Sequence, residues 1–501
     1  MTRLESAAQI DSAVKQREKN REVLVNLTFA LFWIALFEGA LRKWAFPGIG
    51  KYIYFLRDPV LFVIYLLAMR AKFLPKKSFL LTAGGFLAVA AIFLIMIQSA
   101  LSEIQFSWLL AIFGWHSYFI YLPLPFFMSR YLTIADIDHL IKKTLFVAIP
   151  IGLLVVLQFK APAGSVINNG RGTQASEQYN VGFQNGRAPR TSGTFTSALG
   201  QECFTECLFA MTLAMWLRRR SRRPVSFLLL LAATGAALIC IALSGNRGVL
   251  IGTATILFFS GVALLASGRR LLFFQALFAG IAVVPVALLL LSTLFPEALE
   301  ANLAHIRGAG AVEERTFGEL GTLGRVLFQG YGFIYLLPVT PLEGFGMGLG
   351  TNAASLLTNS PTLHGASIYF AIWLPNLFQR LGAETGWGRH ITDMGPILGF
   401  AFILYRIALT TAAAFVARRA AARSRDVTAL VLLGFSFYHL FVGLLTANGT
   451  VGFYALFFLG VAMAVSREQN RVALAPMPPV FLPRRRRLVT PKSPQPVPVT
   501  Q

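Results

Sequence analysis

The sequence predicts an all-α polytopic membrane protein, and three observations lead to that fold class. The chain is 55% hydrophobic and only 13% charged, whereas soluble domains carry about 25% charged residues. Apolar runs of about 17–25 residues, long enough to cross the ~30 Å hydrocarbon core of a bilayer, recur along it. The Lys and Arg residues behind the net charge of +23 cluster in short connectors between these runs. Membrane topology accounts for this charge, so we expect no nucleic-acid partner.

Twelve apolar runs are predicted to span the membrane as helices. In chain order they are residues 22–41, 54–70, 78–99, 108–128, 144–159, 199–217, 225–244, 247–267, 271–295, 394–417, 427–445 and 450–466. They form three blocks, 22–159, 199–295 and 394–466. A polar segment, residues 1–21, precedes the first span, and Arg130–Lys143 is predicted to form a separate amphipathic helix. The basic tail, residues 467–501, is expected to be disordered because it is rich in Pro and Arg.

The basic connectors predict the orientation. With both termini in the cytoplasm, the connectors after residues 70, 217, 267 and 417 all lie on the cytoplasmic side. Two long loops, residues 160–198 and 296–393, then lie outside, and the larger joins the ninth and tenth spans. The larger loop contains two short apolar pieces, Val326–Leu337 and Ile368–Leu377, which we expect to lie on the membrane or re-enter it.

Ionisable residues are costly within a membrane, so their positions are informative. In this topology they gather at the outer ends of helices: Glu38, Arg42, Lys43, Arg57, Asp58, Glu202, Glu206, Arg247, Arg389, His390 and Asp393. We therefore predict a polar chamber at the outer face, roofed by the two outer loops. The alternative for Arg42, Lys43 and Arg57 is snorkelling to lipid headgroups, and for Glu206 a structural ion pair.

Three further polar residues, His116, Arg406 and His439, lie deeper in their spans, and we expect each to be a hydrogen-bonded buried group. The cysteines fall in apolar runs, so we predict no disulfide, no metal site and no other cofactor. Arginine forks bind phosphate oxygens, and a carboxylate or His can accept a proton from an attacking hydroxyl. Without a metal site, arginines would stabilise the charge on a pyrophosphate leaving group. This chemistry suits transfer of a glycan from a polyprenyl pyrophosphate carrier.

Four segments carry motif-like sequences. They are RTSGTFTSALGQECFTECLFA (Arg190–Ala210), LSGNRGVLIG (Leu243–Gly252), GRVLFQGYGFIYLLPVTPLEGFGMGLG (Gly324–Gly350) and ETGWGRHITDMGPILGFAFILYR (Glu384–Arg406). In this order, and with the large outer loop between the ninth and tenth spans, they resemble the superfamily of bacterial O-antigen ligases and O-antigen or exopolysaccharide polymerases. The resemblance implies a GT-C-like fold, a location in the bacterial inner membrane, and a metal-independent, inverting-type glycosyltransferase.

The resemblance also implies roles for particular residues. Arg190 and Arg247 match the phosphate-binding arginines of the superfamily, and Arg325 matches a third; Arg187 and Arg389 are further candidates for binding the pyrophosphate. Arg57, Asp58 and Glu206 are candidates for the border of the site.

The general base departs from the pattern of the superfamily. Its ligases place a catalytic His shortly before the acid that enters the tenth span, and Glu384 stands at that position here. The base is then Glu384, or else His390 or His364 acting from a shifted position. This departure favours a polymerase over a ligase.

The implied partners are a polyprenyl (undecaprenyl) pyrophosphate-linked oligosaccharide donor, a glycan or glycolipid acceptor, membrane lipids, and a chain-length regulator or flippase. Two alternatives stay open at this point. One is an O-antigen ligase that transfers glycan to lipid A-core. The other, from a different class, is a lipid-linked glycan flippase or transporter, which would need broken helices or ionisable groups near the membrane centre.

Overall fold

A computed structural model describes residues 3–75, 78–101, 107–162, 164–170, 190–300, 302–303, 314, 318–351, 354, 385–446 and 448–474. Over these residues the chain is helical and contains no strand. Seven of its helical stretches are long and apolar enough to cross a membrane: Val14–Ala45, Phe79–Leu101, Trp108–Tyr131, Ile134–Lys160, Arg247–Ala266, Gly386–Ser424 and Gly449–Arg471. The chain is therefore an all-helical polytopic membrane protein.

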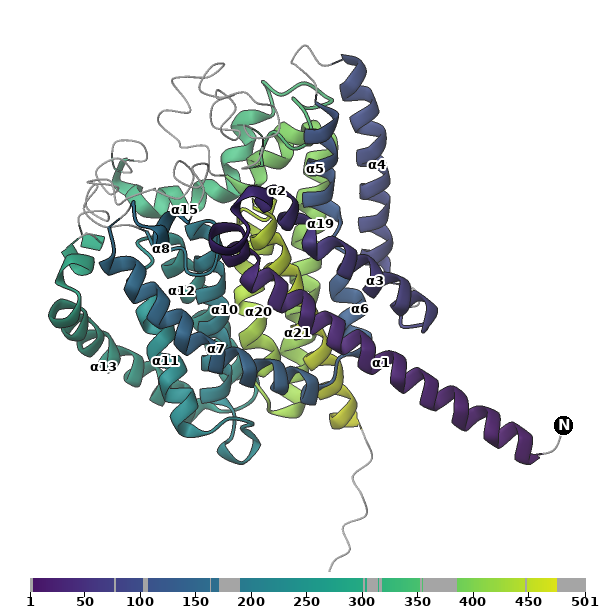
Figure 1. Cartoon of the computed structure of the whole chain (residues 1–501), viewed down its shortest axis with the longest axis horizontal. Coiled ribbons are helices and arrows are strands. Elements are labelled where there is room, and N and C mark those ends of the chain that lie inside the picture. The colour runs from purple at the N-terminus through teal and green to yellow at the C-terminus, as the bar shows by residue number, and fades with distance from the viewer. Residues whose placement is uncertain are drawn as a thin grey trace, which may run out of the picture.

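Figure 1 shows the arrangement of the described helices. The longer ones are α1 (Arg3–Ala40), α3 (Arg57–Arg70), α4 (Phe79–Leu101), α5 (Trp108–Phe119), α6 (Leu124–Tyr131), α7 (Ile134–Lys160), α10 (Ala198–Leu217), α11 (Phe227–Ala242), α12 (Arg247–Ala266), α13 (Arg270–Leu294), α15 (Gly321–Tyr331), α19 (Gly386–Ser424), α20 (Thr428–Phe441) and α21 (Gly449–Leu474). The short ones are η1 (Leu41–Ala45), η2 (Pro47–Ile49), α2 (Gly50–Ile53), η3 (Tyr54–Leu56), α8 (Val166–Asn169), η5 (Arg220–Arg222), η6 (Gly318–Leu320) and η7 (Gly332–Leu336).

Several predicted boundaries are wrong, each for a local reason. The separate amphipathic helix predicted at Arg130–Lys143 is instead divided between the end of α6 and the first part of α7, because Thr133 and Asp136 form a capping box that starts α7 at Ile134. The run predicted at 108–128 coincides with the single stretch Trp108–Tyr131, in which turn residues up to Pro123 separate α5 from α6. The polar segment before the first span continues into α1 from Arg3.

The tenth span differs most from its prediction. Its helix, α19, begins at Gly386 rather than at 394, and it breaks at Gly395, where φ is 73°. Only glycine adopts this backbone readily, and Pro396 follows directly. The break frees the carbonyl of Asp393, which accepts a hydrogen bond of 2.8 Å from Gln98 Nε2 of α4. The segment predicted as the end of the outer loop is thus buried helix.

The core of the bundle is built around α20 and α21, which lie near its middle (Figure 1). The helix α21 packs against α20, α6 and α19, and α20 also packs against α12 and α10. Most residues of α4, by contrast, are left uncovered by other helices, and many of these residues are large and apolar. This contrast is typical of a membrane protein with a protein-packed centre and helices at its edge that face lipid.

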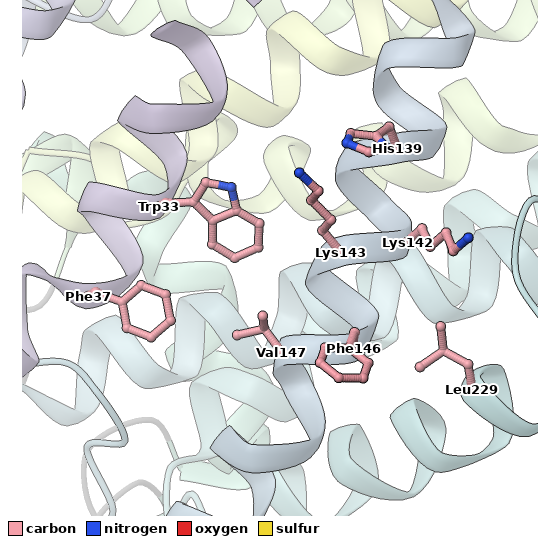
Figure 2. A pocket seen from close by; sticks show the side chains of 8 residues that line it. All are labelled: Trp33, Phe37, His139, Lys142, Lys143, Phe146, Val147 and Leu229. Atoms are coloured by element: carbon pink, nitrogen blue, oxygen red, sulfur yellow. The ribbon is translucent and has the colours of Figure 1, made fainter. Parts of the chain in front are cut away.

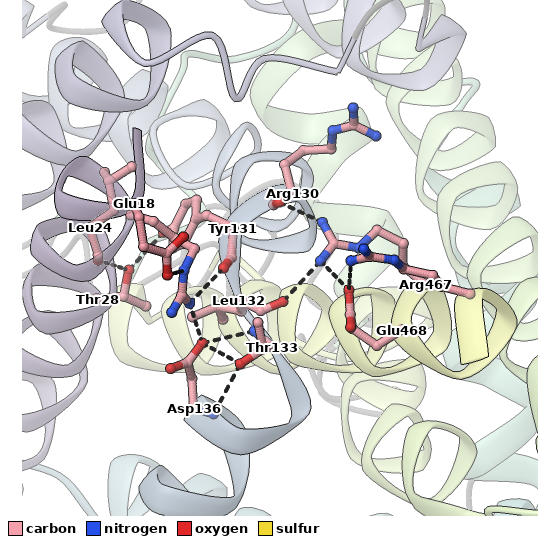
Figure 3. A network of polar contacts seen from close by, with 12 residues as sticks. Glu18, Leu24, Thr28, Arg130, Tyr131, Leu132, Thr133, Asp136, Arg467 and Glu468 are labelled. Carbon is pink, nitrogen blue, oxygen red and sulfur yellow. Dashed lines mark hydrogen bonds and ion pairs between the residues drawn. The ribbon is translucent and has the colours of Figure 1, made fainter. Parts of the chain in front are cut away.

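Polar contacts tie several helix ends together at one end of the bundle (Figure 3). Arg21 of α1 forms an ion pair of 2.7 Å with Asp136 at the start of α7. Arg467, near the end of α21, donates to the carbonyl of Leu132 over 3.2 Å, and Arg218 after α10 pairs with Asp138 over 2.6 Å. This is the end at which the sequence places its basic connectors.

Candidate functional site

At the opposite end of the bundle, a short segment made of residues 190–197 is held between several helices. Lys43 in η1 donates to Ser192 Oγ and to the carbonyl of Gly193, each over 2.9 Å. Gln158 near the end of α7 donates to the same carbonyl over 3.0 Å and accepts from Gly193 N over 2.7 Å. These buried contacts give the segment a defined position, as a preorganised binding site requires.

Two threonines of this segment attach it to neighbouring helices. Thr194 Oγ1 donates to the carbonyl of Leu36 in α1 over 2.7 Å, and Thr191 Oγ1 donates to that of Leu243 after α11 over 3.1 Å. The approach to α1 needs Gly39, because a Cβ there would lie 2.5 Å from the carbonyl oxygen of Thr194. The hydrogen bond from Thr191 places the start of the segment, at Arg190, next to the turn between α11 and α12, which leads into Arg247.

The turn itself is ordered by a cap. Asn246 Oδ1 accepts from Gly248 N over 3.0 Å, which starts α12 at Arg247. Arg42, Lys43, Arg190 and Arg247 therefore lie on adjoining segments at one end of the bundle, and we refer to these four residues as the basic cluster. The Nε atoms of Arg42 and Arg190 are buried and have no hydrogen-bond partner among the residues that the structure describes. Such guanidinium donors are suited to an anionic ligand.

Other polar residues of the predicted chamber are paired with one another. Arg57, only 1% exposed, forms an ion pair of 2.9 Å with Glu38, and its guanidinium lies against the Tyr54, Tyr121 and Phe453 rings. Snorkelling is therefore the wrong explanation for Arg57. Asp58 pairs with His116 over 2.9 Å. Two of the three residues predicted at the site border, Arg57 and Asp58, thus have partners within the protein.

A second group surrounds the start of α19. His390 is fully buried, with Nδ1 3.0 Å from Tyr118 Oη and Nε2 in contact with Arg406 Nη1. Asp393 accepts from the same Tyr118 hydroxyl over 3.0 Å and from Gly350 N over 2.7 Å. Arg389 donates to the carbonyl of Gly350. The part of the large loop around Gly350 is thus attached to α19 by these side chains.

The deep polar residues are hydrogen-bonded, as the sequence predicted. Arg406 donates to the carbonyls of His439, Leu440 and Gly443 over 2.9, 2.7 and 2.9 Å, so it caps the C-terminal end of α20. His439 Nε2 lies 2.7 Å from Glu206 Oε2. Glu206 thus has a buried hydrogen-bonding partner within the protein.

Four predicted residues cannot be placed as a site. Glu384, His364 and Arg187 lie outside the described residues, and Arg325 lies on α15 with its side chain outside the description. Sequence reasoning missed Gln98, Gln158 and Tyr118, which hold the two loops in place. A polar Gln inside an otherwise apolar run was the available signal for the first two.

Comparisons with known proteins leave the family of this chain open. No protein-family model matches the sequence, and no curated protein matches it. Across the part of the chain that the structure describes, no group of three or more His, Cys, Asp or Glu residues is placed to hold a metal ion. The basic cluster is accordingly the candidate functional site.

Proposed function

We propose that the chain is a membrane glycosyltransferase that transfers or polymerises glycan repeat units carried on a polyprenyl pyrophosphate. The observation that carries this proposal is the contact between the Arg190 segment and the Arg247 turn through Thr191. It brings together two arginines from distant parts of the sequence, beside buried guanidinium donors of Arg42 and Arg190 that have no partner among the described residues. Two or more arginine forks match the oxygens of a pyrophosphate and keep their charge in a membrane protein.

In the proposed reaction, a hydroxyl oxygen of the acceptor sugar attacks the anomeric carbon of the donor. The bond from that carbon to the pyrophosphate oxygen breaks, with inversion, and the hydroxyl proton passes to a general base. The arginines of the basic cluster stabilise the negative charge that develops on the leaving polyprenyl pyrophosphate. Both ring nitrogens of His390 are engaged by Tyr118 and Arg406. We therefore assign the base to Glu384 first and to His364 second.

The proposed location follows from the topology that the sequence predicts. In a twelve-span, GT-C-like arrangement with both termini in the cytoplasm, the basic cluster faces the outer side of a bacterial inner membrane. The donor is then an undecaprenyl pyrophosphate-linked oligosaccharide, and the acceptor is a growing glycan in an exopolysaccharide or O-antigen polymerase. An O-antigen ligase that uses a lipid A-core acceptor is the alternative within the same chemistry. A chain-length regulator or a flippase would act together with this glycosyltransferase.

The test uses single substitutions in a cell that makes the polymer. We expect Arg190→Ala, Arg247→Ala and Glu384→Gln each to reduce polymer strongly, while Arg423→Ala, an exposed arginine on α19, leaves it unchanged. Protein level and detergent gel filtration identify variants that fail to fold. Single repeat units accumulating on the carrier lipid indicate a polymerase, and free full-length polymer indicates a ligase. Normal polymer in all three variants contradicts the proposal.

A second candidate function, a lipid-linked glycan flippase or transporter, is favoured by one specific feature. The helix α19 breaks at Gly395, and the buried pair of Arg406 and His390 lies on its two sides. Broken helices with buried ionisable groups are typical of transporters. The two candidates differ in proteoliposomes that contain the purified chain. A flippase moves a fluorescent lipid-linked sugar to the outer leaflet, where an external quencher reaches it. A glycosyltransferase lengthens the glycan of that lipid but leaves the lipid in its original leaflet.

A further inference from the structure

A groove opens between α1, α7 and α11 (Figure 2). Its volume is about 580 Å³. The apolar walls come from Trp33 and Phe37 of α1, Phe146 and Val147 of α7, and Leu229 at the start of α11. Phe146 is 68% exposed. None of the contacts described so far involves this groove.

Three basic residues of α7 border the same groove: His139, Lys142 and Lys143. Figure 2 shows Lys143 reaching toward Trp33, whereas Lys142 lies on the side of Leu229. Among the residues that the structure describes, neither lysine forms an ion pair.

The acids that precede these lysines on α7 are already engaged. Asp136 pairs with Arg21, and Asp138 pairs with Arg218. Asp138 stands one turn before Lys142 but is neutralised by Arg218, so the two lysines leave net positive charge at the groove.

Because the fifth span is predicted at residues 144–159, the two lysines are expected at its cytoplasmic border, where lipid headgroups lie. At 1.5 Å per residue, Lys142 lies about 12 Å along α7 from its first residue, at the end of the bundle with the basic connectors. Beyond the lysines, the same side of α7 continues as an exposed apolar stripe of Phe146, Ile149, Leu153 and Leu157. Helix periodicity places Lys142 at the head of that stripe.

We propose that this groove binds one anionic phospholipid of the leaflet at which α7 begins. The phosphate lies between Lys142 and Lys143, and one acyl chain lies along Trp33, Phe37 and Phe146. Charge complementarity selects an anionic over a zwitterionic headgroup, because each lysine near an anionic lipid surface raises affinity about fivefold. The apolar walls select a lipid over a free phosphate, since burying a chain against them supplies further affinity.

The test measures binding of dioleoyl phosphatidylglycerol and dioleoyl phosphatidylcholine to the full chain in detergent by native mass spectrometry. We expect the wild type to prefer phosphatidylglycerol, and the double variant Lys142→Ala/Lys143→Ala to bind it about 25-fold more weakly. The control Arg418→Ala/Arg419→Ala removes two neighbouring exposed arginines from α19 at the same end of the bundle and should bind as the wild type does.

A second variant, Val147→Phe, fills the groove and keeps both lysines. It should lose phosphatidylglycerol binding, with an unchanged gel-filtration profile as the check on folding. Binding by the lysine variant at wild-type affinity overturns the proposal. Equal losses in the Arg418/Arg419 control also overturn it, because they indicate general attraction to a basic surface. Competition by glycerol 1-phosphate as strong as by the intact lipid overturns it too, since the apolar groove then contributes nothing.

Discussion

The most informative structural prediction concerns Arg406. It caps α20 through hydrogen bonds to the carbonyls of His439, Leu440 and Gly443. The change Arg406→Ala leaves these three buried acceptors without their donor. Hydrogen bonds inside membrane proteins contribute about 0.6 kcal/mol on average and at most about 1.7 kcal/mol each. Loss of three therefore lowers the free energy of unfolding by about 2–5 kcal/mol.

The measurement is unfolding of the purified chain in mixed micelles of increasing SDS content, followed by circular dichroism. Arg423→Ala is the matched control, because Arg423 lies on the same helix, is exposed, and makes one side-chain hydrogen bond of 3.3 Å to Asn470. Its free energy of unfolding should change by no more than about 0.5 kcal/mol. If Arg406→Ala were as stable as Arg423→Ala, the capping role assigned to Arg406 would be refuted.

Three further predictions test other contacts. Arg57→Ala should lower the free energy of unfolding by about 3–5 kcal/mol, because Glu38 stays buried without its partner. Replacing both Arg57 and Glu38 by Met should recover most of this loss. A double variant as unstable as Arg57→Ala would contradict the assigned ion pair. Gly39→Val should abolish binding of undecaprenyl pyrophosphate, because a side chain at position 39 would displace Thr194 and the segment that contains Arg190. Gly85→Val, at a glycine with open space around it, should preserve binding. Equal binding by the two variants would contradict the close contact between Gly39 and Thr194. Gln98→Leu should speed proteolysis of the large loop, because it removes the hydrogen bonds of Gln98 to Glu343 and Met347 in that loop. An unchanged cleavage rate would show that Gln98 does not hold the loop in place.

Much of the fold could be predicted because apolar length alone marks a membrane-crossing helix. Boundaries failed where polar residues turned out to be buried. The segment that contains Arg389, His390 and Asp393 has the composition of a loop, yet it forms helix because Tyr118 and Gly350 satisfy its polar groups. Partners that are 39 to 275 residues distant leave no local trace in a sequence.

The candidate site was predictable only in part. The motifs singled out Arg190 and Arg247, but no spacing in the sequence shows that Thr191 joins their segments. Arg57 has the sequence context of an interfacial residue, and only the structure reveals that Glu38 neutralises it. Arg406 lies deep in its span because it binds the carbonyls at the end of α20, which ends at Phe441. Hydropathy does not indicate this end, since the apolar run continues past Phe441.

The central claim is that the basic cluster binds a lipid pyrophosphate, and direct binding tests it most directly. Undecaprenyl pyrophosphate is titrated into the purified full chain and into Arg190→Ala, Arg247→Ala and the control Arg423→Ala. A charge-assisted hydrogen bond contributes about 1.5–3 kcal/mol, so we expect each cluster variant to bind at least about tenfold more weakly. The control should bind as the wild type does. Equal affinity across all four proteins would contradict the claim.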